Sequence, residues 1–141
     1  MRRLLLLIAA TILLCALPVL AADYNYVAPA EFKQWLESGK AMKIVDIQVP
    51  AEFQKQRIKG SIETNAYPVK SAEDKQKLDK VLPQLAASQE DIVVVCPRGG
   101  GGAKNTYDYL KGKGISEKRL FILTNGIQGW PYKQLTVSDA K

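Results

Sequence analysis

The residues best suited to chemistry lie in one short segment, in which Cys96, Pro97 and Arg98 precede four consecutive glycines. A cysteine thiolate is a nucleophile, and successive glycines can turn their backbone N–H groups toward one point because they tolerate positive φ angles. Arg98 adds a positive charge, and the start of a following helix adds a partial one. We therefore expect a reactive Cys96 thiolate, with substrate contacts from Arg98 and the glycines Gly99, Gly100, Gly101 and Gly102.

Each of these residues also has a structural interpretation. A free cysteine at a strand end is often a small buried hydrophobe, and Arg98 taken alone is equally well explained as a solvated side chain. Lys104 lies where the helix should begin, which is an unfavourable end for a cation. It therefore either contacts an anionic ligand or is simply exposed. The glycines and arginine that follow Cys96 favour the reactive role for the thiol.

The counts of cysteine and histidine exclude several classes of site. The chain has two cysteines, Cys15 and Cys96, and no histidine, so a Cys–His protease and a histidine-containing zinc site cannot be built. A C-x-x-C pair is absent because Gly99 occupies its second position. A nucleotide-binding P-loop is also absent, since Ala103 and not glycine precedes Lys104.

The first 22 residues have the pattern of a signal peptide. Arg2 and Arg3 precede an apolar run over residues 4–17, and small residues at 21–22 suit cleavage. Removal would take Cys15 away and leave residues 23–141, with 18 basic and 14 acidic side chains. We expect export, to the periplasm, without stable membrane association. An uncleaved membrane anchor is the alternative.

Short strands and helices alternate along the rest of the chain. Apolar runs predict strands at 42–47, at 91–95, at 120–123 and, more weakly, at 61–66. Helices are predicted from Pro29 to Gly39, from Ser71 toward Pro83, and over residues 103–113, with a loop or short helix from Pro50. This order indicates one domain with a parallel α/β sheet. Ligands bind beyond the carboxyl ends of such strands, which is where Cys96 follows residues 91–95.

Four segments carry a resemblance to a known family. They are an Asp-Ile-Gln-Val-Pro-Ala-Glu-Phe sequence at 46–53, Ile-Lys-Gly-Ser-Ile at 58–62, the strand and glycine loop at 93–102, and Asn-Gly-Ile-Gln-Gly-Trp at 125–130. In order and spacing they resemble the rhodanese family. The resemblance implies a rhodanese-like, doubly wound α/β domain, with a small central parallel sheet flanked by helices and a core of about residues 28–132.

The resemblance also implies an activity. Cys96 would take sulfane sulfur from a small anionic sulfur donor, such as thiosulfate or polysulfide, and pass it as a persulfide to a thiol, a cyanide-like acceptor or a protein acceptor. Arg98 would orient the sulfur donor and Lys104 would assist, while Asp46 and Glu52 would support the loops. The resemblance implies that neither a metal nor an organic cofactor is required.

Three positions depart from the family pattern: Gln48 replaces an arginine, Arg57 replaces a histidine, and Gly101 stands where an arginine is frequent. We expect weak activity with thiosulfate and room for a larger sulfur carrier.

Other functions compete with sulfur transfer. Phosphatases and arsenate reductases of this fold use C-x5-R, but the residue six positions after Cys96 is Gly102. The anion would then lack its bidentate clamp. A non-catalytic binding module, or a thiol redox sensor based on Cys96, is the alternative from a different class. Nucleic-acid binding has little support, because basic and aromatic residues are not interleaved.

Overall fold

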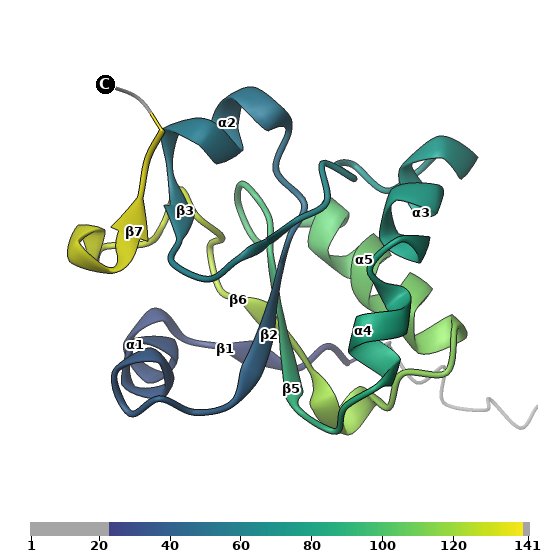
Figure 1. The fold of residues 1–141 in the computed structure, drawn as a ribbon, viewed down its shortest axis with the longest axis horizontal. Coiled ribbons are helices and arrows are strands. Elements are labelled where there is room, and N and C mark those ends of the chain that lie inside the picture. Colours follow the sequence, from purple (N-terminus) through teal and green to yellow (C-terminus); the bar gives the residue numbers. More distant parts are fainter. Residues whose placement is uncertain (1–22, 140–141) are drawn as a thin grey trace, which may run out of the picture.

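A five-stranded parallel sheet lies at the centre of the computed structural model, which describes residues 23–139 (Figure 1). The strands lie in the order β1 (Tyr26–Val27), β6 (Leu120–Leu123), β5 (Asp91–Val95), β2 (Met42–Asp46) and β4 (Ile62–Glu63). All neighbouring pairs in this sheet run parallel. The predicted parallel α/β fold is therefore confirmed.

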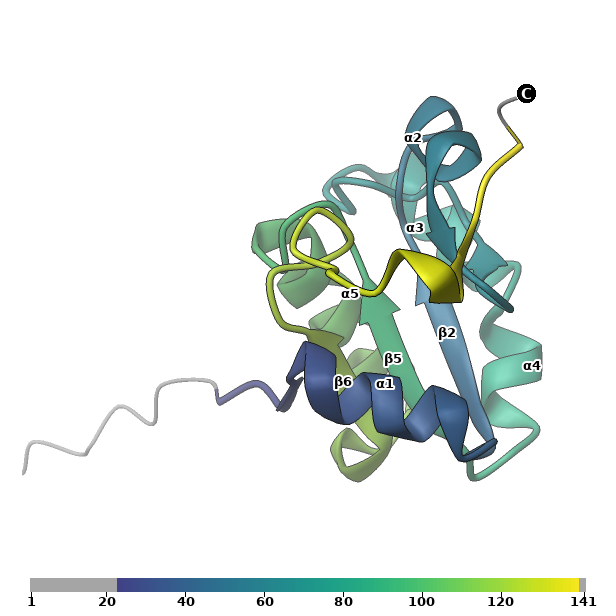
Figure 2. The same ribbon diagram turned by 90° about the vertical axis from the view of Figure 1, so that its left-hand side faces the viewer.

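Helices cover both faces of the sheet (Figures 1 and 2). Helix α1 (Pro29–Glu37) covers one face, and α3 (Ala72–Asp79), α4 (Leu82–Ala86) and α5 (Gly101–Gly112) cover the other. Helix α2 (Pro50–Lys55) follows the carboxyl end of β2. A small antiparallel pair joins β3 (Arg57–Ile58) to β7 (Thr136–Val137), and two short 3₁₀ helices span Glu117–Arg119 and Lys133–Leu135.

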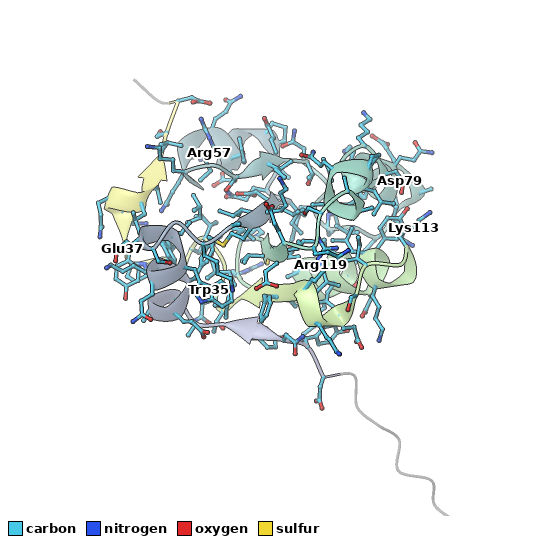
Figure 3. All side chains as sticks on the ribbon, turned by 60° about the horizontal axis from the view of Figure 1, so that its bottom comes forward. Trp35, Glu37, Arg57, Asp79, Lys113 and Arg119 are labelled. Atoms are coloured by element: carbon cyan, nitrogen blue, oxygen red, sulfur yellow. The ribbon has the colours of Figure 1, made fainter. Side chains whose placement is uncertain are left out.

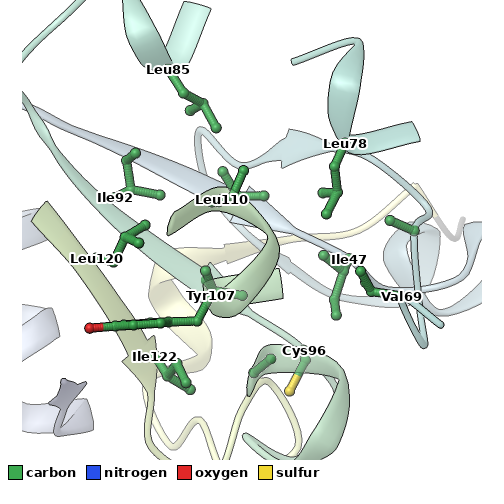
Figure 4. Packing of buried hydrophobic residues seen from close by; sticks show 14 of the residues in the cluster. Ile47, Val69, Leu78, Leu85, Ile92, Cys96, Tyr107, Leu110, Leu120 and Ile122 are labelled. Carbon is green, nitrogen blue, oxygen red and sulfur yellow. The ribbon is translucent and has the colours of Figure 1, made fainter. Parts of the chain in front are cut away.

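Strand β5 is central because both of its faces are apolar. Ile92 and Val94 pack into one buried cluster, while Val93 and Val95 pack into the other, and all four side chains are fully buried. A continuous β-branched run suits this position, since a parallel strand covered on both sides needs no polar face. Cys96 lies at one end of the first cluster (Figure 4). The core thus fixes the strand that presents the thiol.

The strand at 120–123 and the helix from Pro29 follow the sequence prediction, whereas other boundaries differ. Only Ile62–Glu63 of the predicted strand 61–66 pairs with β2. Pro83 does not limit the preceding helix but lies in the first turn of α4, where its missing N–H costs nothing. Helix α5 begins at Gly101, two residues earlier than predicted. Because glycine has low helix propensity, the sequence does not indicate that the helix already includes residues 101–102.

A buried arginine ties the helical layer to the sheet. Arg119 is 8% exposed and precedes β6 (Figure 3). Its Nε donates to the carbonyl oxygen of Glu90 at 2.8 Å, and its Nη2 donates to that of Leu85 at 2.9 Å. These bonds satisfy carbonyls at the end of α4 and just before β5.

The predicted signal peptide and its cleavage site lie outside the described residues. Across residues 23–139, no helix combines the length and apolar character needed to cross a membrane.

Candidate active site

Cys96 lies directly after β5, at the carboxyl edge of the sheet. Its side chain is 2% exposed, and it is a free thiol. The backbone N–H of Gly99 donates to its Sγ at 2.9 Å. A hydrogen bond from an amide favours the charged form of the acceptor. The backbone of the turn after β5 therefore supplies a hydrogen-bond donor to the Cys96 sulfur.

The glycine loop passes from this turn into helix α5. Gly99 has φ +73°, a conformation that favours glycine. Lys104 N–H makes the first backbone hydrogen bond of the new helix, to the Gly100 carbonyl at 3.1 Å. The N–H groups just before it belong to the first turn, which has no intrahelical acceptors. An anion cradle at these amides, supported by the helix dipole, stays a prediction.

A pocket of about 220 Å³ adjoins the thiol. Its lining comprises Tyr67, Cys96, Pro97, Arg98, Gly100, Gly101 and Gly102. Arg98 is the one charged residue in this lining and is exposed. Gly101 is also exposed, and a Cβ at this position would meet no atom within 4 Å. The pocket is therefore open on its glycine side, beside Arg98.

Sequence reasoning missed Tyr67. It lies in the loop after β4, and β4 pairs in parallel with β2. Loops that follow neighbouring parallel strands meet at the same edge of the sheet. The predicted strand at 61–66 therefore carried a signal for this residue, since Tyr67 is the first side chain beyond it.

A second loop braces the Cys96 turn from behind. The N–H of Ile127 donates to the Cys96 carbonyl at 2.9 Å, and that of Gln128 donates to the Pro97 carbonyl at 3.0 Å. A Cβ added to Gly99 would lie 2.9 Å from the Asn125 nitrogen, so the two backbones touch. Trp130, 1% exposed, anchors this loop by packing on Phe32. The segment 125–130 thus has a structural task at the site.

Asp46 is fully buried at the end of β2, next to β5. Its carboxylate accepts the backbone N–H of Gln48 at 2.9 Å and the Gln48 side-chain amide at 3.0 Å. Burial raises the pKa of this carboxyl from 3.8 to about 6, although both hydrogen bonds oppose the shift. The same Gln48 amide donates to the Gln56 carbonyl at 3.0 Å. Gln48, which stands in place of an arginine, therefore holds the loop together and does not line the pocket.

The predicted residues Lys104 and Glu52, and Arg57, which replaces a histidine of the family pattern, lie outside the pocket lining. Lys104 is exposed, and its Nζ lies 5.7 Å from the ring centroid of Tyr24. Glu52 is exposed and pairs with Lys55 at 3.0 Å. Arg57 pairs with Asp139 at 2.8 Å. None of the three reaches Cys96 in the arrangement described. Within residues 23–139, no group of three or more His, Cys, Asp or Glu side chains is placed to hold a metal.

Two adjacent glycines of α5 should respond oppositely to substitution. A Cβ on Gly102 would lie 2.9 Å from ring carbons of Tyr67 and 3.2 Å from Ile47, whereas one on Gly101 meets open space. Gly102→Ala should therefore lower the free energy of unfolding by about 1–3 kcal/mol. Gly101→Ala should leave it unchanged or raise it by up to about 1 kcal/mol. Urea denaturation compares the two variants, and equal effects would contradict the packing described.

In a comparison with protein families, the model described as Rhodanese-like domain matches residues 28–133. A comparison with curated proteins finds no significant match.

Solved structures of similar fold have different activities. A yeast protein tyrosine phosphatase of the Rhodanese family is 17% identical, with a TM-score of 0.63 over 85% of this chain and 96% of its own. An As-Sb reductase from Leishmania major is also 17% identical, with a TM-score of 0.63, and covers 84% of this chain and 88% of its own. A thiosulfate sulfurtransferase from Pseudomonas aeruginosa is 18% identical, with a TM-score of 0.61, over 82% of this chain and 20% of its own. At these identities the likeness establishes the fold alone.

Proposed function

Because the chain belongs to the rhodanese-like domain family, we propose that it is a sulfurtransferase that carries sulfane sulfur as a persulfide of Cys96. One observation carries the proposal: the Cys96 Sγ accepts a backbone N–H at 2.9 Å and borders a pocket lined chiefly by glycine. A nucleophile held this way needs no neighbouring base, which suits a chain without histidine.

The first half-reaction loads the cysteine. The Cys96 thiolate attacks the outer sulfur of thiosulfate, the S–S bond of thiosulfate breaks, and its electron pair leaves with sulfite. With polysulfide, the leaving group is a polysulfide anion shorter by one sulfur. In both cases Cys96 becomes Cys–S–S⁻, and no external oxidant is consumed. Arg98, which lines the pocket, attracts the anionic sulfur donor.

The second half-reaction returns the thiolate. A nucleophilic acceptor, such as a thiolate or cyanide, attacks the terminal sulfur of the persulfide, and the electron pair of the broken S–S bond stays on Cys96. The amides at the start of α5 can stabilise the negative charge on the persulfide while the acceptor enters. The exposed glycines leave this approach uncovered.

Phosphoryl or arsenate chemistry has less support. The position that would carry the arginine of C-x5-R is Gly102, and the Tyr67 ring lies against it. The pocket therefore offers only Arg98 as a cation. A non-catalytic or thiol redox-sensing role for Cys96 remains the alternative that the test below separates.

Intact-mass spectrometry tests the proposal. The protein should gain about 32 Da, one sulfur, on treatment with polysulfide or thiosulfate, and cyanide should remove the added mass as thiocyanate. Cys96→Ser, the matched control, should gain nothing. A wild-type protein that gains no sulfur from either compound would overturn the sulfurtransferase proposal. It would favour the binding or redox-sensing role.

A further inference from the structure

We propose that Tyr67 determines which sulfur donor this pocket accepts, by placing an aromatic wall where a C-x5-R loop carries its arginine. The wall favours a linear, polarisable sulfur chain, such as polysulfide or an organic persulfide, over tetrahedral oxyanions such as thiosulfate, phosphate and arsenate. The inference rests on the proposed sulfur transfer for its substrate class. Its structural part, the exclusion of oxyanions, stands independently.

The wall is defined by contact between Tyr67 and the glycine loop. Tyr67 is the one aromatic residue in the lining of the Cys96 pocket. A Cβ on Gly102 would lie 2.9 Å from both Cδ2 and Cε2 of its ring. No side chain fits at position 102 while the ring stays in place. The absence of arginine six positions after Cys96 is thus matched by a residue that fills the space.

The segment that carries the ring is fixed on two sides. The Tyr67 N–H donates to the Ile47 carbonyl at 2.9 Å, next to β2. Asn105 of α5 donates its side-chain amide to the Pro68 carbonyl at 3.2 Å. Val69 has φ +61°, an unfavourable angle for a β-branched residue. Strained backbone of this kind persists where surrounding contacts hold it, and it concentrates at functional sites.

The chemistry of the lining distinguishes the two classes of sulfur donor. A tetrahedral dianion is best held by a bidentate guanidinium with further donors around it, and Arg98 is the single cation available here. Divalent sulfur makes favourable contacts with the edge of an aromatic ring. The phenol hydroxyl of Tyr67 has no hydrogen-bond partner among residues 23–139. The ring rather than the hydroxyl touches the loop, so we assign the selectivity to the ring.

Rates of Cys96 persulfide formation measure this selectivity. Tyr67→Leu removes the ring but keeps an apolar side chain, and Tyr67→Phe is its matched control. The ratio of the second-order rate constants for inorganic polysulfide and thiosulfate should fall about 3- to 10-fold in Tyr67→Leu. It should stay within about 2-fold of wild type in Tyr67→Phe. An unchanged ratio in Tyr67→Leu, or an equal fall in both variants, would overturn the assignment to the ring.

Alkylation of Cys96 tests the wall without any sulfur transfer. Iodoacetamide is neutral, so phosphate or arsenate should slow its reaction with Cys96 only by occupying the pocket. Neither anion should protect the wild-type thiol, whereas the double variant Tyr67→Ala/Gly102→Arg should be protected by both. If phosphate or arsenate protects the wild-type thiol, or if neither protects the thiol of a folded double variant, the proposal that the Tyr67 ring excludes oxyanions is wrong. A wild-type protein that accepts no sulfur would overturn only the proposed function, since the alkylation result remains decisive for Tyr67.

Discussion

Gly126→Ala should lower the free energy of unfolding by about 3 kcal/mol or more and should impair sulfur loading of Cys96. Gly126 has φ +60°, and its Cβ would collide with the Cys96 carbonyl oxygen and lie 2.6 Å from the Arg98 nitrogen. Both are backbone atoms of the Cys96 turn, so relief requires moving that turn. Urea denaturation and intact-mass loading with polysulfide measure the two effects.

Gly39→Ala is the matched control. Gly39 has φ +70°, close to that of Gly126, but no atom lies within 4 Å of its added Cβ. Gly39→Ala should lower the free energy of unfolding by about 1–2 kcal/mol, because alanine disfavours the left-handed conformation, and it should leave sulfur loading of Cys96 unchanged. The difference between the variants measures the contact between the two loops. Equal losses of stability and normal loading in Gly126→Ala would show that the 125–130 segment does not brace the site.

The sequence was sufficient to predict the central sheet and the position of Cys96 at its carboxyl edge, because both depend on local signals. The run at 91–95 is β-branched and uninterrupted, and a thiol, an arginine and four glycines follow it directly. A parallel sheet places such a strand end at the binding edge whatever the rest of the chain does. The structure indeed buries β5 on both faces and places Cys96 beside a pocket.

Features that depend on contacts between distant segments could not be predicted. Tyr67 is 29 positions before Cys96, and nothing in its local sequence indicates that its ring packs on Gly102. Strands β1, β3 and β7, with two residues each, carry too few residues for a periodic pattern. Lys104 was a candidate from helix electrostatics, yet its exposed side chain extends over Tyr24. The local charge pattern does not indicate the direction in which the Lys104 side chain extends.

Asp46 should make the protein less stable as the pH rises from about 4 to about 7. Burial raises the pKa of its carboxyl from 3.8 to about 6, so between these values the folded state binds more protons than the unfolded state. The stabilisation is complete below the unfolded pKa and is lost as the pH passes the folded value. The stability of wild type relative to Asp46→Asn should therefore decrease by about 2–3 kcal/mol over this range.

Asp74→Asn provides a control, because the stability that Asp74 contributes should change with pH in the opposite direction. Hydrogen bonds from the backbone N–H groups of Lys70 and Ser71 lower the pKa of Asp74 below 3.8, so the stability that Asp74 contributes is present above that value and is lost as the pH falls through the folded value. Chemical denaturation from about pH 2 to about pH 7, with each variant referred to wild type, covers both transitions and separates these slopes from constant offsets. An Asp46→Asn difference that does not vary with pH would mean that the carboxyl titrates normally. The loop after β2 would then carry a charged Asp46 throughout the range.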